Sequence, residues 1–132
     1  MASLTSPRIP VSWGELLDKL SILAIKRERI HAAEANANVA REYALLHQVG
    51  AAVLREAEVA ALFDTLRHVN EQLWDIEDAI RAEEARASFG PAFVDLARSV
   101  YRKNDERAAI KRRIDVALGS ALVEEKSYWS AA

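Results

Sequence analysis

The chain has 132 residues, no cysteine, and 18 basic against 20 acidic side chains, which gives a net charge of -2. This length suits one domain with its own hydrophobic core, and the lack of cysteine excludes disulfides, thiolate metal sites and a cysteine nucleophile. The near balance of charge leaves no field of one sign to attract nucleic acid or an anionic membrane.

No apolar stretch approaches the roughly 18 to 20 residues of a membrane helix, and the N-terminus lacks the regions of a signal peptide, so we expect a cytoplasmic protein. Few glycines and prolines and abundant Ala, Leu, Glu and Arg favour helix throughout. The composition predicts an all-α protein, a four-helix bundle of mostly antiparallel helices with a short C-terminal tail. We expect a single domain over residues 1–132, with an extended lead-in at 1–11, a bundle at 12–128 and a frayed tail at 129–132.

The first helix is predicted over residues 13–33. Ser12 and Glu15 have the spacing of a capping box, in which each side chain satisfies a backbone amide at the start of the helix. The main apolar stripe follows one helical face and consists of Leu16, Leu20, Leu23 and Ile30.

This helix is apolar on a second side as well, because Ile22 and Ile25 point away from the main stripe. They share their face with the charged residues Glu15, Asp18, Lys19, Lys26 and Arg29. A central place in the bundle or a homodimer contact through Ile22 and Ile25 would explain the pattern. A ligand site that uses Glu15, Asp18 or Lys26 is the alternative.

The second helix is predicted to start at Asn36 or Asn38, and a turn is expected between Gly50 and Glu58, because glycine weakens a helix interior. Its expected buried stripe is Val39, Tyr43, Leu46, Val49 and Val53.

The third helix is predicted to end near Arg86 and has the clearest periodicity. Its seam is Leu62, Leu66, Val69, Leu73, Ile76 and Ile80, in alternating steps of three and four. A second stripe borders the core and contains Asn70, Trp74, Glu77 and Arg81. An acidic stripe of Glu71, Asp75 and Asp78 lies nearly opposite the seam, and we interpret it as a solvated face rather than a magnesium site.

A turn at residues 88–91 precedes the last helix, which is predicted to reach Leu118, with Gly119 as its stop. Its apolar face is interrupted by two polar turns, and counting outward from the short turn sets them opposite the border stripe of the third helix. The sequence therefore predicts a polar cleft between the last two helices, formed by Asn70, Trp74, Glu77, Arg81, Tyr101, Asn104, Arg107 and Lys111.

Such a cleft has cations and an aromatic ring for a small anionic ligand or for a protein partner's side chains, which would make the chain a binding or interaction module. A structural network that fixes helix register is the competing explanation. In the tail, Tyr128 and Trp129 are expected to pack.

No metal site or cofactor is predicted. His31, His47 and His68 lack metal-ligand spacing, and no nucleophile elbow, phosphate loop or dinucleotide fingerprint occurs. An all-helical enzyme remains the alternative function, either a magnesium-dependent nucleotide pyrophosphohydrolase or a bundle like chorismate mutase. The motifs of neither class are specific here.

Four stretches resemble a bacterial family without assigned activity, domain of unknown function 6165. They are GELLDKLSILAIKRERI at 14–30, NEQLWDIEDAIR at 70–81, FVDLARSVYRKNDERAAIKRRI at 93–114 and EEKSY at 124–128. The resemblance implies no established chemistry. Relatives look like proteins encoded among surface-polysaccharide and glycosyltransferase genes, which implies a carbohydrate-linked context by association only.

Overall fold

A computed structural model describes residues 4–126 of the chain. The elements are α1 (Trp13–Arg29), α2 (Ala33–Gly50), the short 3-10 turn η1 (Val53–Arg55), α3 (Ala57–Ala85) and α4 (Pro91–Ala117). No strand occurs within this range, which confirms the predicted all-α class with four helices. None of the helices among the described residues is long and apolar enough to cross a membrane.

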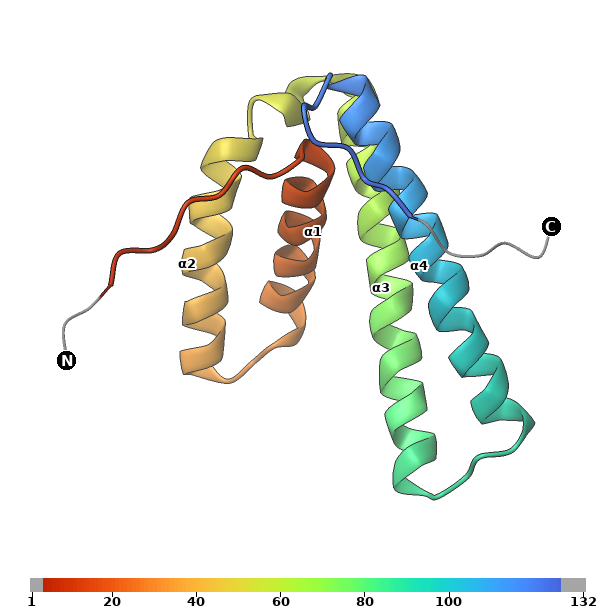
Figure 1. The fold of residues 1–132 in the computed structure, drawn as a ribbon. Coiled ribbons are helices and arrows are strands. Elements are labelled where there is room, and N and C mark those ends of the chain that lie inside the picture. The colour runs from red at the N-terminus through yellow and green to blue at the C-terminus, as the bar shows by residue number, and fades with distance from the viewer. Residues whose placement is uncertain (1–3, 127–132) are drawn as a thin grey trace.

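The helices form two hairpins, α1 with α2 and α3 with α4, joined by η1 (Figure 1). Helix α1 packs against all three of the other long helices, whereas α2 packs mainly against α1. This central place explains why α1 is apolar on two sides. One side faces α2 and the other faces the α3–α4 hairpin.

Helix α1 starts where the capping pattern predicts it. The side chain of Ser12 accepts a hydrogen bond of 3.0 Å from the amide of Glu15. The helix ends at Arg29, four residues before the predicted end at 33, and Ile30 caps it in an extended conformation.

The predicted start of the second helix is wrong. Helix α2 begins at Ala33, and Asn36 serves the preceding helix instead, since its side-chain amide donates to the carbonyls of Arg27 and Ile30. An asparagine that satisfies the last carbonyls of one helix resembles, in sequence, an asparagine that starts the next. The buried stripe of α2 is also weaker than predicted, because Val49 is exposed.

The boundaries around α3 and α4 agree with the sequence to within one residue. The turn predicted between Gly50 and Glu58 contains η1, and Pro91 opens α4 at its first position. Helix α4 ends at Ala117, two residues before Gly119, whose φ of 61° is a conformation that glycine adopts without strain.

The core lies where α1 covers the α3–α4 hairpin. Its buried residues are Leu17, Leu20, Val59, Leu62, Leu66, Val69, Ile110 and Ile114. The hairpin extends beyond the ends of α1 and α2 (Figure 1). There the seam residues Ile76, Ile80, Phe93 and Leu96 are only partly buried.

Candidate ligand-binding cleft

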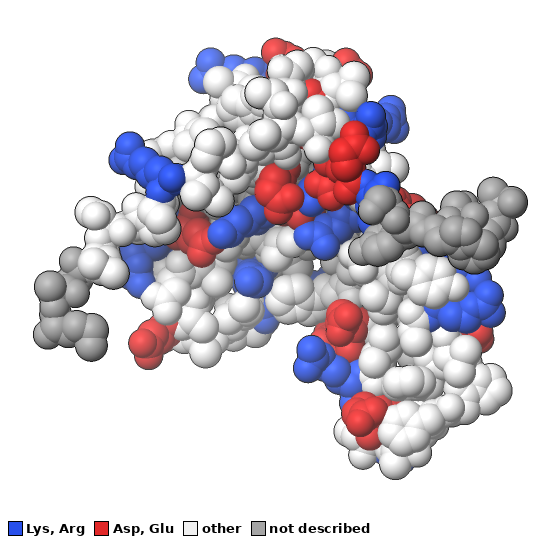
Figure 2. Space-filling model, in the orientation of Figure 1, with Lys and Arg blue, Asp and Glu red and all other residues white. Residues whose placement is uncertain are grey.

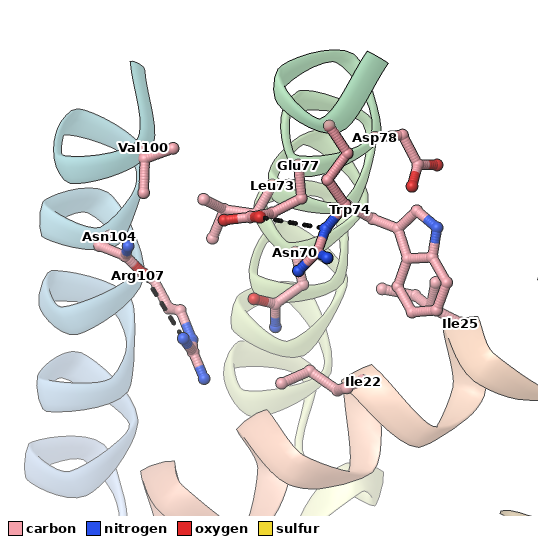
Figure 3. Close-up of a pocket in the computed structure, with 11 residues that line it drawn as sticks. Ile22, Ile25, Asn70, Leu73, Trp74, Glu77, Asp78, Val100, Asn104 and Arg107 are labelled. Carbon is pink, nitrogen blue, oxygen red and sulfur yellow. Dashed lines mark hydrogen bonds and ion pairs between the residues drawn. The ribbon is translucent and has the colours of Figure 1, made fainter. Parts of the chain in front are cut away.

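A cleft of about 440 Å³ opens between α3 and α4, and α1 forms its third wall. It is lined by Ile22, Ile25, Asn70, Leu73, Trp74, Glu77, Asp78, Arg81, Val100, Asn104 and Arg107. Figure 3 shows that Asn104 and Arg107 extend from α4 toward α3 and α1, whereas Trp74 and Asp78 lie on the side of α3 away from α4. Six of the eight residues predicted for the cleft line it: Asn70, Trp74, Glu77, Arg81, Asn104 and Arg107.

The apolar part of the cleft is made by Ile22 and Ile25 of α1, Leu73 of α3 and Val100 of α4. Ile25 is 1% exposed, and Ile22 is partly buried beside it. The burial of Ile25 favours a central place of α1 in the bundle over the homodimer contact through Ile22 and Ile25 as the explanation of this second apolar side. The second apolar side of α1 is used inside the chain.

The wall of the cleft between α1 and α4 is fixed by a bidentate ion pair between Arg107 and Asp18. Nε of Arg107 donates to Oδ1 of Asp18 at 2.9 Å, and a second guanidinium nitrogen donates to Oδ2. Asp18 is 1% exposed, so its charge depends on this partner for compensation. The hydrogen bonds that Arg107 donates to Asp18 outweigh the effect of burial and raise the pKa of Arg107, which stays charged.

Two further side chains complete the contacts around Asp18. The amide of Asn70 donates to Oδ1 of Asp18 at 3.0 Å and to the hydroxyl of Ser21 at 2.8 Å. Ser21 in turn donates to the backbone carbonyl of Asp18 at 2.7 Å. Among the described residues, every buried side-chain nitrogen and oxygen has a hydrogen-bond partner, and this holds for the buried polar atoms around Asp18.

Asp18 was predicted only as a secondary candidate and Ser21 was missed. The ion pair joins residues 89 positions apart, and no local pattern predicts such a partner. The spacing of three between Asp18 and Ser21, on a helix face that also carries Leu17 and Leu20, was the available signal.

Arg107 has guanidinium N–H groups that are not bonded to Asp18 and can reach the cleft. Its Nη1 contacts only the side-chain oxygen of Asn104, at the long distance of 3.5 Å, and its side chain is 29% exposed. In Figure 3 the Arg107 side chain extends from α4 toward α1. Asp18 therefore holds the guanidinium by one edge, and other N–H groups remain for an acceptor in the cleft.

The rim on α3 carries charges of both signs. Glu77 and Arg81 form a loose pair at 3.9 Å, and both are well exposed. Asp78, predicted on the solvated face, is exposed and also lines the cleft. Trp74 lies beside them, with the guanidinium of Arg29 5.7 Å from its ring centroid.

Lys111 does not line the cleft, contrary to prediction. Its ammonium pairs with Glu15 at 2.8 Å and with Glu124 of the tail at 3.2 Å. Burial lowers the pKa of Lys111, but the hydrogen bonds that its ammonium donates to these carboxylates, together with the charge of Asp18, outweigh burial, and the net shift is upward. Glu15, predicted for the capping box or a ligand, is therefore engaged in holding α4 and the tail.

A second buried carboxylate ties α1 to the tail. Asp115 is fully buried and accepts from the amide of Gly14 at 2.6 Å and from the amide of Glu124 at 2.8 Å. The hydroxyl of Ser120 accepts from the amide of Trp13 at 3.3 Å. We call Lys111, Asp115, Ser120 and Glu124 the clasp. The sequence did not predict the clasp, because its contacts depend on how the residues after α4 lie against α1 and α4.

Two more candidate residues do not line the cleft. Tyr101, which was predicted for it, is 54% exposed, and Lys26, a candidate ligand-site residue of the first helix, is partly buried. The predicted packing of Tyr128 and Trp129 falls outside the described residues. Residues 120–126 run back beside α4, where Arg112 bonds the carbonyl of Glu124 (Figure 1).

Two residues of the acidic stripe of α3 form ion pairs with basic residues. Glu71 pairs with Arg67 at 3.0 Å and Asp75 pairs with Arg29 at 2.6 Å. Within residues 4–126, no group of three or more His, Asp or Glu side chains is placed to hold a metal ion.

Comparison with known proteins gives one family and nothing more specific. No curated protein and no solved structure matches the chain. The model of a family of unknown function, DUF6165, matches residues 8–132 and so covers nearly the whole chain, including all of the cleft and the clasp. The chain therefore belongs to the family of unknown function DUF6165.

Proposed function

We propose that the protein is a binding module whose cleft between α1, α3 and α4 receives a small ligand or a partner's side chain. The observation that supports it best is the way Asp18 holds Arg107, because a buried carboxylate orients the guanidinium while leaving donors directed at an accessible cavity. Preformed cavities with an apolar wall and a few convergent polar groups are typical binding sites.

The lining favours a ligand with an apolar body and one acceptor group, such as a carboxylate. The apolar body would lie on Ile22, Leu73 and Val100, beside the Trp74 ring. The acceptor would receive hydrogen bonds from Arg107 and Arg81. Because Asp18 already offsets the charge of Arg107, and Glu77 and Asp78 stand at the rim, a highly charged anion would fit less well than a monoanion.

Calorimetric titration with indole-3-acetate and its neutral amide, indole-3-acetamide, tests the proposal on the full chain. We expect the carboxylate to bind more tightly than the amide. Arg81→Gln should weaken carboxylate binding by about fivefold, or roughly 1 kcal/mol as for an exposed charge pair, and leave amide binding unchanged.

Filling the cleft provides the matched control. Val100→Trp should abolish binding of both probes, whereas Val116→Trp, on an exposed position of the same helix outside the cleft, should bind as the parent does. Circular dichroism would verify that both variants fold. Failure of both probes to bind the parent, or equal binding by Val100→Trp, would contradict the proposal.

A further inference from the structure

The cleft has two ends that differ in their polar groups. At the end beside α1, which we call the inner end, Arg107 and the side-chain amide of Asn70 both donate to Oδ1 of Asp18, at 2.9 Å and 3.0 Å. The shared acceptor sets these two donors at one level of the bundle. Nη1 of Arg107 lies 3.5 Å from Oδ1 of Asn104, which is a long hydrogen bond, so Arg107 can still donate to an acceptor at this end.

The opposite end of the cleft, toward the turn between α3 and α4, is mostly acidic, and we call it the outer end. Glu77 follows Asn70 by two helical turns on α3, which places it about 10 Å further along the helix axis. The charged side chains that line the outer end are Glu77, Asp78 and Arg81, so acids outnumber bases there. Arg81 offsets the charge of Glu77 weakly, because the pair is 3.9 Å apart and the Arg81 side chain is 80% exposed.

Apolar side chains separate the two ends. Leu73 lies one turn before Glu77 on α3, and Val100 extends from α4; both line the cleft and both are partly buried. Figure 3 shows Leu73 and Glu77 on the side of α3 that faces α4, with Val100 and Arg107 extending from α4 toward them. In the space-filling view, charged and uncharged side chains alternate over the face of the molecule, without one field of either sign (Figure 2). This side of the cleft is therefore a groove with donors at the inner end, an apolar middle and a carboxylate at the outer end.

We infer that the ligand of the cleft is a linear zwitterion, with a carboxylate at the inner end, an ammonium group at the outer end and an apolar chain between them. This inference rests on the proposed function and specifies its ligand class. The carboxylate accepts from Arg107, and the ammonium group donates to Glu77 in place of the loose contact with Arg81. An α-amino acid cannot satisfy both ends, because its two charged groups are attached to one carbon. A chain such as that of 6-aminohexanoate can reach both, since a hydrogen bond of about 3 Å at each end covers part of the separation.

Calorimetric titration of the full chain with a matched set of probes tests the ligand class. We expect 6-aminohexanoate to bind about fivefold more tightly than hexanoate, which lacks the ammonium group. The isomer 2-aminohexanoate, whose ammonium group is next to the carboxylate, should bind no more tightly than hexanoate. Glu77→Gln should remove the preference for 6-aminohexanoate and leave hexanoate binding unchanged. Glu84→Gln, at an exposed position of the same helix outside the cleft, should retain the preference.

Reversing the charge of the outer end should reverse the preference. Glu77→Lys removes the partner of an ammonium group and supplies a partner for a second carboxylate. We expect the parent to bind 6-aminohexanoate more tightly than adipate, which has a carboxylate at each end, and Glu77→Lys to bind adipate more tightly. Glu77 is exposed, and circular dichroism would verify that the variant keeps its helices. If parent and variant prefer the same probe, the outer end does not select the charge and the inference is wrong.

The outcomes separate this inference from the proposed function. Binding of hexanoate or indole-3-acetate in the cleft, without a preference for 6-aminohexanoate, would keep the binding module and overturn the zwitterion. A preference that persists in Glu77→Gln would also overturn the zwitterion. If none of these probes binds the parent, both the inference and the proposed function fail.

Discussion

At the residue scale, Gly14 lets the start of α1 lie close to the backbone of α4. Its amide donates to the buried Asp115, and a Cβ at this position would lie 2.8 Å from Oδ1 of Asp115 and closer still to the carbonyl oxygen of Lys111. A side chain here would meet backbone that cannot move aside. The glycine is needed for contact between helices rather than for an unusual φ.

Gly14→Ser should therefore lower the free energy of unfolding by about 1–3 kcal/mol, the usual cost of overpacking. Gly90→Ser is the matched control, because no atom lies within 4 Å of a Cβ there and serine is a favoured residue at the start of a helix. Urea denaturation measures both variants. A Gly14→Ser protein as stable as the parent would contradict the close contact.

Lys111 gives the protein a pH-dependent contribution to stability. Its pKa is raised in the folded state, so its stabilising effect is complete below the unfolded value of about 10.4 and is lost as pH rises through the higher folded value. We expect Lys111→Met to be about 1 kcal/mol less stable than the parent at pH 7, since its partner Glu15 is exposed.

The difference should shrink above about pH 10.4. Denaturation of both proteins at several pH values checks this, with Lys103→Met, which removes a surface pair to Glu106, as the control. A difference that stays constant into the alkaline range would mean that the Lys111 charge does not contribute.

At the element scale, Asp115 joins the start of α1 and the residues after α4, because it accepts from the amides of Gly14 and Glu124. Asp115→Asn retains the shape but leaves one carbonyl acceptor for the amides of Gly14 and Glu124. The free energy of unfolding should fall by about 1.5–3 kcal/mol, the range for a hydrogen bond to a charged group. Hydrogen exchange at those two amides should accelerate more than exchange in α2.

The control for this change is Asp105→Asn, an exposed aspartate on the same helix, which should stay within about 0.5 kcal/mol of the parent. Unchanged exchange at Gly14 in Asp115→Asn would show that the clasp does not hold the start of α1.

The element boundaries show what sequence patterns can predict. Ser12 and Pro91 mark helix starts by contacts within a few residues, and the structure places both as predicted. The start predicted at Asn36 was wrong because the partners of its side chain, Arg27 and Ile30, lie at the end of the preceding helix. The same limit applies to the cleft. Asn70 and Asn104 could be placed by counting outward from the short turn between their helices. The pairing of Asp18 with Arg107 could not be predicted, because it depends on how the two hairpins dock.

At the scale of the whole molecule, α1 is the element on which the arrangement depends. It packs α2 on one side, holds Arg107 of α4 through Asp18, and contributes Ile22 and Ile25 to the cleft. The apolar residues on two sides of α1 predicted this central place as one of two explanations, although the seam of α3 is more regular. The docking of the two hairpins through α1 creates the cleft. It leaves the end of the α3–α4 hairpin near residues 85–91 uncovered by α1 and α2 (Figure 1).

The most direct measurement of the binding role is a chemical-shift map of the full chain during titration with indole-3-acetate. We predict that the largest changes fall on the indole N–H of Trp74, the side-chain amides of Asn70 and Asn104, and the Nε–H of Arg107. The same titration of Val100→Trp should leave these signals unmoved. Changes that cluster away from these groups, or that persist unchanged in Val100→Trp, would contradict a ligand site between α1, α3 and α4.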